Sequence, residues 1–173
     1  GTNGDTQEIS IGSGLTLNST TGVLSASGGG GSCYDTLDTY NANPATTITG
    51  STSATYIHPT GTTFGTTKIS KVLVAPTSGV LKNLFVFASG TQPSNGALSF
   101  TIQIGSTDIT TVSDTSLVVT IAANTSAGSS GTVYSNTIDT VSVNAGDLIT
   151  IKANNAATTA SLTVNSIGLL LTN

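Results

Sequence analysis

Few residues in this chain of 173 could do chemistry, and they are not grouped in the sequence. The single histidine, His58, precedes Pro59 in a threonine-rich stretch without a cluster of partners around it. Nucleophilic catalysis needs a nucleophile, a base and an orienting group, and a metal site needs several ligands together. We therefore predict that the protein is not an enzyme and has no catalytic residues, no metal site and no cofactor.

The aspartates are scattered, and most stand beside glycine, serine or threonine: Asp35, Asp38, Asp108, Asp114, Asp139 and Asp147. Aspartate in such a setting usually accepts backbone N–H groups in turns, which is how we interpret most of them. A pair brought together by folding, as glycoside hydrolysis requires, stays open as an alternative because sequence separation does not exclude spatial closeness.

Aromatic side chains offer a different chemistry, the binding of saccharides. The chain has four tyrosines, and a tyrosine ring gives an apolar face with a polar tip at little entropic cost. Tyr134 stands two residues before Asn136 and close to the polar stretch 122–131. We predict that Tyr134 and Asn136 contact a ligand, the alternative being that the tyrosines pack at the rim of the fold or between subunits.

Composition excludes two classes of partner. The formal net charge is -4 and the basic residues are four lysines, whereas nucleic-acid binding needs a clustered basic surface. No apolar run reaches the length needed to span a bilayer, so we expect neither nucleic acid nor membrane insertion. Cys33 is the only cysteine, which leaves a spectator thiol or a crosslink between chains as its two interpretations.

Short runs of aliphatic and β-branched residues between turn signals predict the elements that would position these side chains. No segment has the period of an amphipathic helix, and the spacing of the runs is typical of an antiparallel β-sandwich or jelly roll. Strands are expected throughout, including over 69–75 and 108–112. We therefore predict an all-β fold.

Two of these strands carry apolar side chains on both faces. In the run 80–88, Leu84 and Val86 alternate with Phe85 and Phe87. In the last strand the apolar parity changes, so that either a bulge shifts the phase or both faces are buried. Burial of both faces favours a neighbouring subunit, since a small antiparallel sheet usually keeps one wet face. We predict a homotrimer whose interface comprises Phe85, Phe87, Ile167, Leu169 and Leu171.

The N-terminal part differs in composition from the rest. Glycine occupies every third position over residues 1–6, as in a collagen-type repeat, and very short apolar runs separated by turns follow. Such pieces cannot bury their apolar side chains alone. We predict a fibre stem or trimerisation segment over 1–27, a glycine-rich hinge over 28–32 and a jelly-roll head over 33–173.

Several segments carry a resemblance to known families. The segment 146–151, followed by 166–171 at the end, resembles the last two strands of heads of the complement and tumour-necrosis-factor type. It is also similar to jelly-roll tips of bacteriophage fibres and of collagen-like spore-surface proteins, as is the strand start 75–84. The segments 9–17 and 21–25 look like a stretch common in phage fibre proteins.

The resemblance implies a homotrimer and a binding role at the tip of a viral, most specifically bacteriophage, fibre. The protein would then stand on the virion surface, outside cells, as a host-attachment module that recognises a cell-surface glycan or protein receptor. The alternative that it leaves is a structural one, a capsid or spore-surface decoration whose head keeps the trimer in register.

Overall fold

A computed structural model describes residues 15–17, 24–26, 38–48, 53–159 and 162–172. The chain divides into two compact units, Gly1–Asp35 and Thr36–Asn173. The expected collagen-like remnant, the glycine hinge, Cys33 and both predicted domain boundaries lie outside the described residues. In the first unit, the two short strands β1 (Leu15–Leu17) and β2 (Leu24–Ala26) pair antiparallel.

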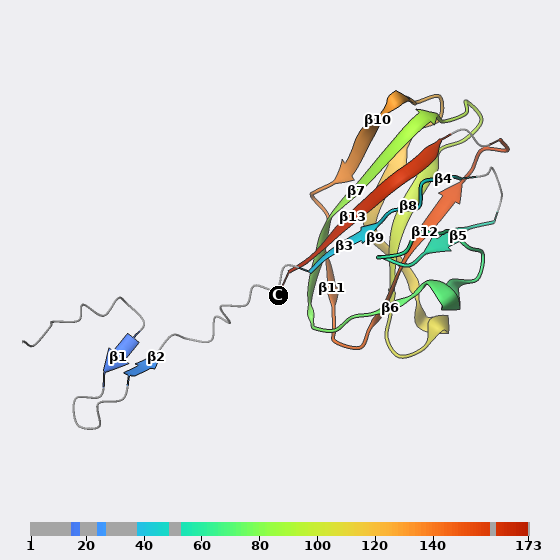
Figure 1. Cartoon of the computed structure of the whole chain (residues 1–173). Coiled ribbons are helices and arrows are strands. Elements are labelled where there is room, and N and C mark those ends of the chain that lie inside the picture. The colour runs from blue at the N-terminus through green and yellow to red at the C-terminus, as the bar shows by residue number, and fades with distance from the viewer. Residues whose placement is uncertain (1–14, 18–23, 27–37, 49–52, 160–161, 173) are drawn as a thin grey trace, which may run out of the picture. The chain divides into compact units, whose positions relative to one another are not determined.

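The second unit is built almost entirely of strands, with two short 3₁₀ turns, η1 and η2, among its described residues (Figure 1). Its elements are β3 (Asp38–Ala42), β4 (Thr46–Thr47), β5 (Thr55–Ile57), η1 (Lys68–Lys71), β6 (Leu73–Val74), β7 (Gly79–Thr91), β8 (Leu98–Gly105), η2 (Ile109–Thr111), β9 (Ser113–Ile121), β10 (Ser126–Asn136), β11 (Val141–Val143), β12 (Leu148–Asn155) and β13 (Thr163–Thr172). No helix among the described residues has the length and apolar character that crossing a bilayer requires.

The described strands of the second unit form two antiparallel sheets. The six-stranded sheet runs β10-β7-β13-β3, with β11 on β7 and β4 on β13. The five-stranded sheet runs β5-β12-β8-β9, with β6 on β12. Pairing is nested along the chain, because β3 pairs with β13, β5 with β12, β7 with β10, and β8 with β9. Nested antiparallel pairs of this kind define a jelly roll, and the predicted all-β sandwich is confirmed.

The core lies between the two sheets and follows the period of two that strands impose. Every second side chain of β8 points inward, as Leu98, Phe100 and Ile102 do, and all three are buried. The predicted alternation in β7 is confirmed too: Leu84 and Val86 are buried, whereas Phe85 and Phe87 are exposed on the other face.

Two of the predicted strands are wrong in part. Residues 68–71 form η1, so that only Leu73–Val74 of the expected strand pairs with β12. Residues 109–111 form η2, where the Asp108 carboxylate accepts the Thr110 N–H at 2.8 Å. Apolar content alone suggested strands in both places, but a strand also needs a partner edge.

The closing strand shows why its apolar parity changes. Val164 is paired with Ala88 and Ser166 with Phe87, so Asn165 is an extra residue in β13. This bulge moves the following side chains onto the inner face. One copy of the chain therefore buries all the inward apolar side chains of the strand: Val164, Ile167, Leu169 and Leu171.

The bulge corrects the predicted trimer interface. Ile167, Leu169 and Leu171 are 1%, 2% and 0% exposed within a single chain, so they do not present a surface to another copy. Their prediction as interface residues is wrong. The strand buries only one face, and the bulge changes which sequence positions point to that face, so that the apolar residues before and after the bulge were interpreted as two faces. Phe85 and Phe87 are 40% and 36% exposed and keep the outward position that an interface needs.

Candidate functional site

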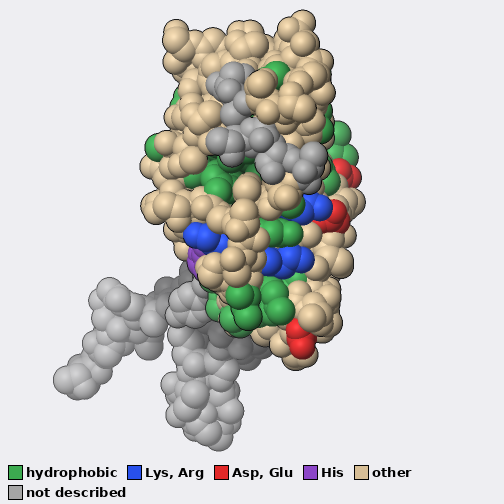
Figure 2. All heavy atoms as spheres, turned by 90° about the vertical axis from the view of Figure 1, so that its right-hand side faces the viewer, with side chains coloured by type: hydrophobic (Ala, Val, Ile, Leu, Met, Phe, Trp, Pro, Cys, Tyr) green, Lys and Arg blue, Asp and Glu red, His purple; other side chains and the backbone are tan. Residues whose placement is uncertain are grey.

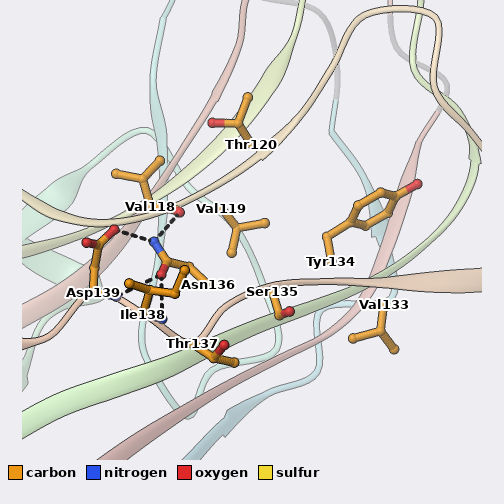
Figure 3. A pocket seen from close by; sticks show the side chains of 10 residues that line it. All are labelled: Val118, Val119, Thr120, Val133, Tyr134, Ser135, Asn136, Thr137, Ile138 and Asp139. Carbon is orange, nitrogen blue, oxygen red and sulfur yellow. Dashed lines mark hydrogen bonds between the residues drawn. The ribbon is translucent and has the colours of Figure 1, made fainter.

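The two predicted ligand residues line one groove at the open side of the sandwich (Figure 3). The groove has a volume of about 640 Å³ and lies where β9, the edge of one sheet, meets β10, the edge of the other. Its lining is mixed in polarity: Val118, Val119, Thr120, Val133, Tyr134, Ser135, Asn136, Thr137, Ile138 and Asp139.

Asn136 holds the groove together rather than facing an open space. Its Nδ2 donates to the Val118 carbonyl at 2.9 Å and to Asp139 Oδ2 at 2.7 Å. Its Oδ1 accepts the N–H groups of Ile138 at 3.2 Å and Asp139 at 3.0 Å. An amide offers two donors and two lone pairs, so this side chain is fully used in joining the end of β10 to the β9 backbone.

Tyr134 has hydrogen-bonding capacity left. Its ring is half-buried against the core, and its hydroxyl is buried without a hydrogen-bond partner among the described residues. A buried hydroxyl without a partner is costly, and because this one is covered it is not open to a ligand in this structure. Tyr134 and Asn136 both line the groove, and Asn136 fixes its shape. Ligand contact by either of them stays a prediction.

Apolar side chains form the rim of the groove. Ile138 is 90% exposed and Val133 is 59% exposed. Neither was singled out in the sequence, although alternation with Tyr134 indicates the outward position of Val133. Nothing local to the sequence indicates Val118, because its place depends on β9 lying beside β10 across the sandwich.

The outward face of the six-stranded sheet is the second feature of interest. Val133 pairs directly with Phe87, so both side chains stand on the same face as Phe85. Small residues surround this aromatic pair, since Ser135 and Gly168 flank Phe85 and Ser166 flanks Phe87. Phe85, Phe87 and Val133, which we name the outer apolar face, therefore stand among small residues.

The other candidate groups are engaged in local structure. Asp147 accepts the Asn144 N–H at 2.8 Å, and Asp108 caps η2, which confirms their interpretation as turn residues. His58 Nδ1 accepts the Thr60 N–H at 3.2 Å. Partial burial, and then the nearby Lys71 charge, lower the pKa of His58. Among the described residues no three potential metal ligands come together.

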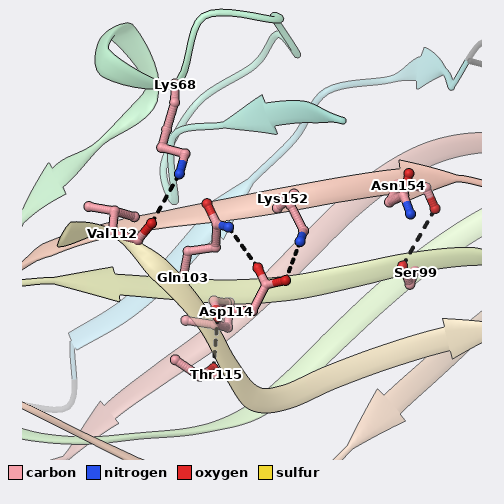
Figure 4. A network of polar contacts seen from close by, with 9 residues as sticks. Lys68, Ser99, Gln103, Val112, Asp114, Thr115, Lys152 and Asn154 are labelled. Atoms are coloured by element: carbon pink, nitrogen blue, oxygen red, sulfur yellow. Dashed lines mark hydrogen bonds and ion pairs between the residues drawn. The ribbon is translucent and has the colours of Figure 1, made fainter. Parts of the chain in front are cut away.

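Asp114 is the one described carboxylate held by a cation. Its Oδ1 accepts Gln103 Nε2 at 2.6 Å, and its Oδ2 pairs with Lys152 (Figure 4). Burial raises the pKa of this carboxyl, but the two donors and the charges of Lys152 and Lys68 outweigh burial and lower it.

No protein-family model and no curated protein matches this sequence. A solved structure of Eiger TNF from S. frugiperda aligns with 79% of this chain and 92% of its own, at 10% identity and a TM-score of 0.42. The fold assigned here rests on the nested strand pairing and not on that alignment.

Proposed function

We propose that this protein is a trimeric viral fibre tip, most specifically of a bacteriophage, that attaches to a glycan or protein on the host cell surface without catalysing a reaction. The outer apolar face is the observation that carries the proposal, because it offers an aromatic surface that a second copy can cover. The resemblance of the N-terminal segments to phage fibre proteins supports the placement on the virion surface.

The chemistry of the outer apolar face favours association. Phe85, Phe87 and Val133 stand together on a sheet face whose neighbouring positions are serine and glycine. Small neighbours allow another backbone to approach closely, so the aromatic rings can be buried rather than merely touched. Burial of apolar area contributes about 25 cal/mol per Å².

A trimer would also explain how an open groove can serve in adhesion. The groove at Tyr134 is open, and a site of this kind binds a single saccharide weakly. Once one of three sites on a stalk is bound, the other two meet the cell surface at a high effective concentration. The avidity of the trimer then exceeds the affinity of a single site by roughly 100-fold or more.

The association is tested by light scattering on the full chain at micromolar concentration. We expect the mass of a trimer, and a shift to the monomer mass in the Phe85→Ser/Phe87→Ser variant. Ile69→Ser is the matched control, since Ile69 is 65% exposed but lies in η1, away from this sheet. A monomeric wild-type chain contradicts the proposal.

The adhesive role is tested by binding of the full chain to host cells and to immobilised glycans. We expect saturable binding that is lost in the monomeric variant. A trimer that binds neither cells nor glycans contradicts adhesion and favours the structural alternative, in which the head only keeps a capsid or spore-surface decoration in register. Release of reducing ends from host capsule contradicts the proposal of a non-enzymatic role.

A further inference from the structure

Three of the four lysines of the chain converge on one tyrosine, Tyr56 in β5. Lys152 is its direct partner across the ladder, and Lys68 Nζ stands 5.4 Å from the centre of its ring. On its other side Tyr56 pairs with Gly65. The end of the Lys71 side chain lies against this glycine, since a Cβ on Gly65 would be 3.0 Å from Lys71 Cε. Figure 2 shows lysine side chains gathered on this face, with the histidine at its margin.

Two of these three lysines form no ion pair with another described residue. Lys152 pairs with Asp114, which is the only ion pair within the described parts of the chain. Lys68 instead donates to the Val112 carbonyl at 3.1 Å, and Lys71 to Thr63 Oγ1 at 3.0 Å, both neutral acceptors. An ammonium group has three donors, so each of these two lysines keeps charge and donors for a ligand.

A polar network holds the third lysine, Lys152, in place (Figure 4). Gln103 is 5% exposed and donates to Asp114, which directs that carboxylate toward Lys152. Asp114 is therefore satisfied by two donors of its own sheet, and it does not draw Lys68 or Lys71 into a pair. Both lysines are half-buried, so their side chains are partly ordered before a ligand arrives.

The surroundings indicate the class of the ligand. With a net charge of -4, the chain as a whole repels a long polyanion such as nucleic acid. A single anionic group, by contrast, is bound by charge-assisted hydrogen bonds from an ammonium group. Polar, uncharged side chains also stand on the outward face of this sheet, among them the paired Ser99 and Asn154. Hydroxyl and amide groups of this kind bind the hydroxyls of a sugar.

We propose that Lys68 and Lys71, beside Tyr56, bind the anionic group of an acidic saccharide. The proposal rests on the proposed adhesive function and names the ligand class: a glycan that carries a carboxylate, sulfate or phosphate. Lys68 and Lys71 contact the anion, Tyr56 supports Lys68 through its ring, and Lys152 stays with Asp114. This face lies on the five-stranded sheet and is separate from the groove at Tyr134.

The test measures binding of the full chain to two pairs of probes: oligogalacturonate with its methyl ester, and dextran sulfate oligosaccharide with dextran. We expect binding to the charged member of at least one pair, weakened by 500 mM salt. Lys68→Gln and Lys71→Gln should each weaken it about tenfold, the value of one charge-assisted hydrogen bond. Lys82→Gln removes the same charge from β7 in the other sheet and should leave the affinity unchanged.

The outcomes separate this proposal from the one on which it rests. If the chain binds host cells or neutral glycans while the lysine variants bind every probe as the wild type does, the anionic site is overturned and adhesion stands. If the wild type binds no cell and no glycan, adhesion itself is overturned. Preference for the carboxylated or the sulfated probe identifies the anion, and unchanged thermal unfolding of the variants shows that the fold is intact.

Discussion

At the scale of single residues, Gly131 and Phe87 fit together on the outer apolar face. Gly131 has a φ of +82°, and a Cβ on it would lie 2.5 Å from Phe87 Cε2. The Phe87 ring therefore lies against bare backbone, which only glycine offers. This contact keeps the ring along the sheet, and it ties the bulged part of β10 to β7.

We predict that Gly131→Ala destabilises the chain by about 1–3 kcal/mol, since it adds backbone strain at positive φ to a steric clash with the ring. Gly128→Ala is the control, because Gly128 also has positive φ but no atom lies within 4 Å of its Cβ position. Urea denaturation measures both. If the clash is real, Gly131→Ala lowers the free energy of unfolding more than Gly128→Ala does, and the added change Phe87→Ala should remove that difference. Equal losses of stability in the two glycine variants contradict the clash.

His58 makes the stability depend on pH. Its pKa is lowered by burial and by Lys71, so folding favours the neutral ring, whose Nδ1 accepts the Thr60 N–H. The resulting stabilisation is present above the ordinary pKa of about 6.5 and is lost as pH falls through the lowered value. We expect a fall in the melting temperature from pH 7.5 to pH 5 that is smaller in His58→Asn. NMR titration of His58 should give a higher pKa in Lys71→Gln, and no rise contradicts the role of that charge.

At the scale of elements, the closing strand marks the limit of what the sequence predicts. Alternation placed Phe85 and Phe87 correctly, because β7 keeps a period of two from Leu84 to Ala88. In β13 the same rule left a bulge and a two-faced strand open, and the two-faced interpretation, from which the interface residues were predicted, is wrong. Only the register against β7, which is a long-range property, shows the extra residue Asn165.

The candidate sites divide in the same way. Tyr134 and Asn136 were predicted from their closeness in sequence beside a polar stretch, and the structure places both in one groove, whereas ligand contact stays a prediction. The lysine cluster was not found. Lys68 and Lys152 meet only because β5 pairs with β12, which brings Tyr56 opposite Lys152, and no local signal indicates that pairing.

The bulge in β13 gives the prediction for this scale. Deleting Asn165 moves three buried side chains to the outer face, at about 2 kcal/mol for each. That loss approaches the whole stability of a typical domain, about 5–15 kcal/mol, so we expect the variant to be unfolded by circular dichroism. Asn165→Ala keeps the extra residue and loses only the hydrogen bond to Ser89 Oγ at 3.2 Å, so it should fold. A folded deletion variant means that the register is not fixed by burial.

At the scale of the whole molecule, the head is closed by strands from its two ends. β3 and β13 pair, and β13 lies between β3 and β7 in the six-stranded sheet. The central strand of that sheet is therefore the last of the described strands in chain order. Contacts of such sequence separation make folding slow, because the loop must close before the pairing stabilises it.

This arrangement predicts that the two ends of the chain tolerate removal very differently. Removing residues 166–173 leaves β7 and β3 without the strand between them and exposes the core, so we expect loss of cooperative thermal unfolding. Removing residues 1–35 takes away a unit that is compact by itself, and the head should melt within about 5 °C of the full chain, the shift that roughly 1 kcal/mol produces. Calorimetry on both truncations decides the matter. If loss of 1–35 abolishes the transition, the head needs the N-terminal unit to fold, and the two units are one cooperative structure.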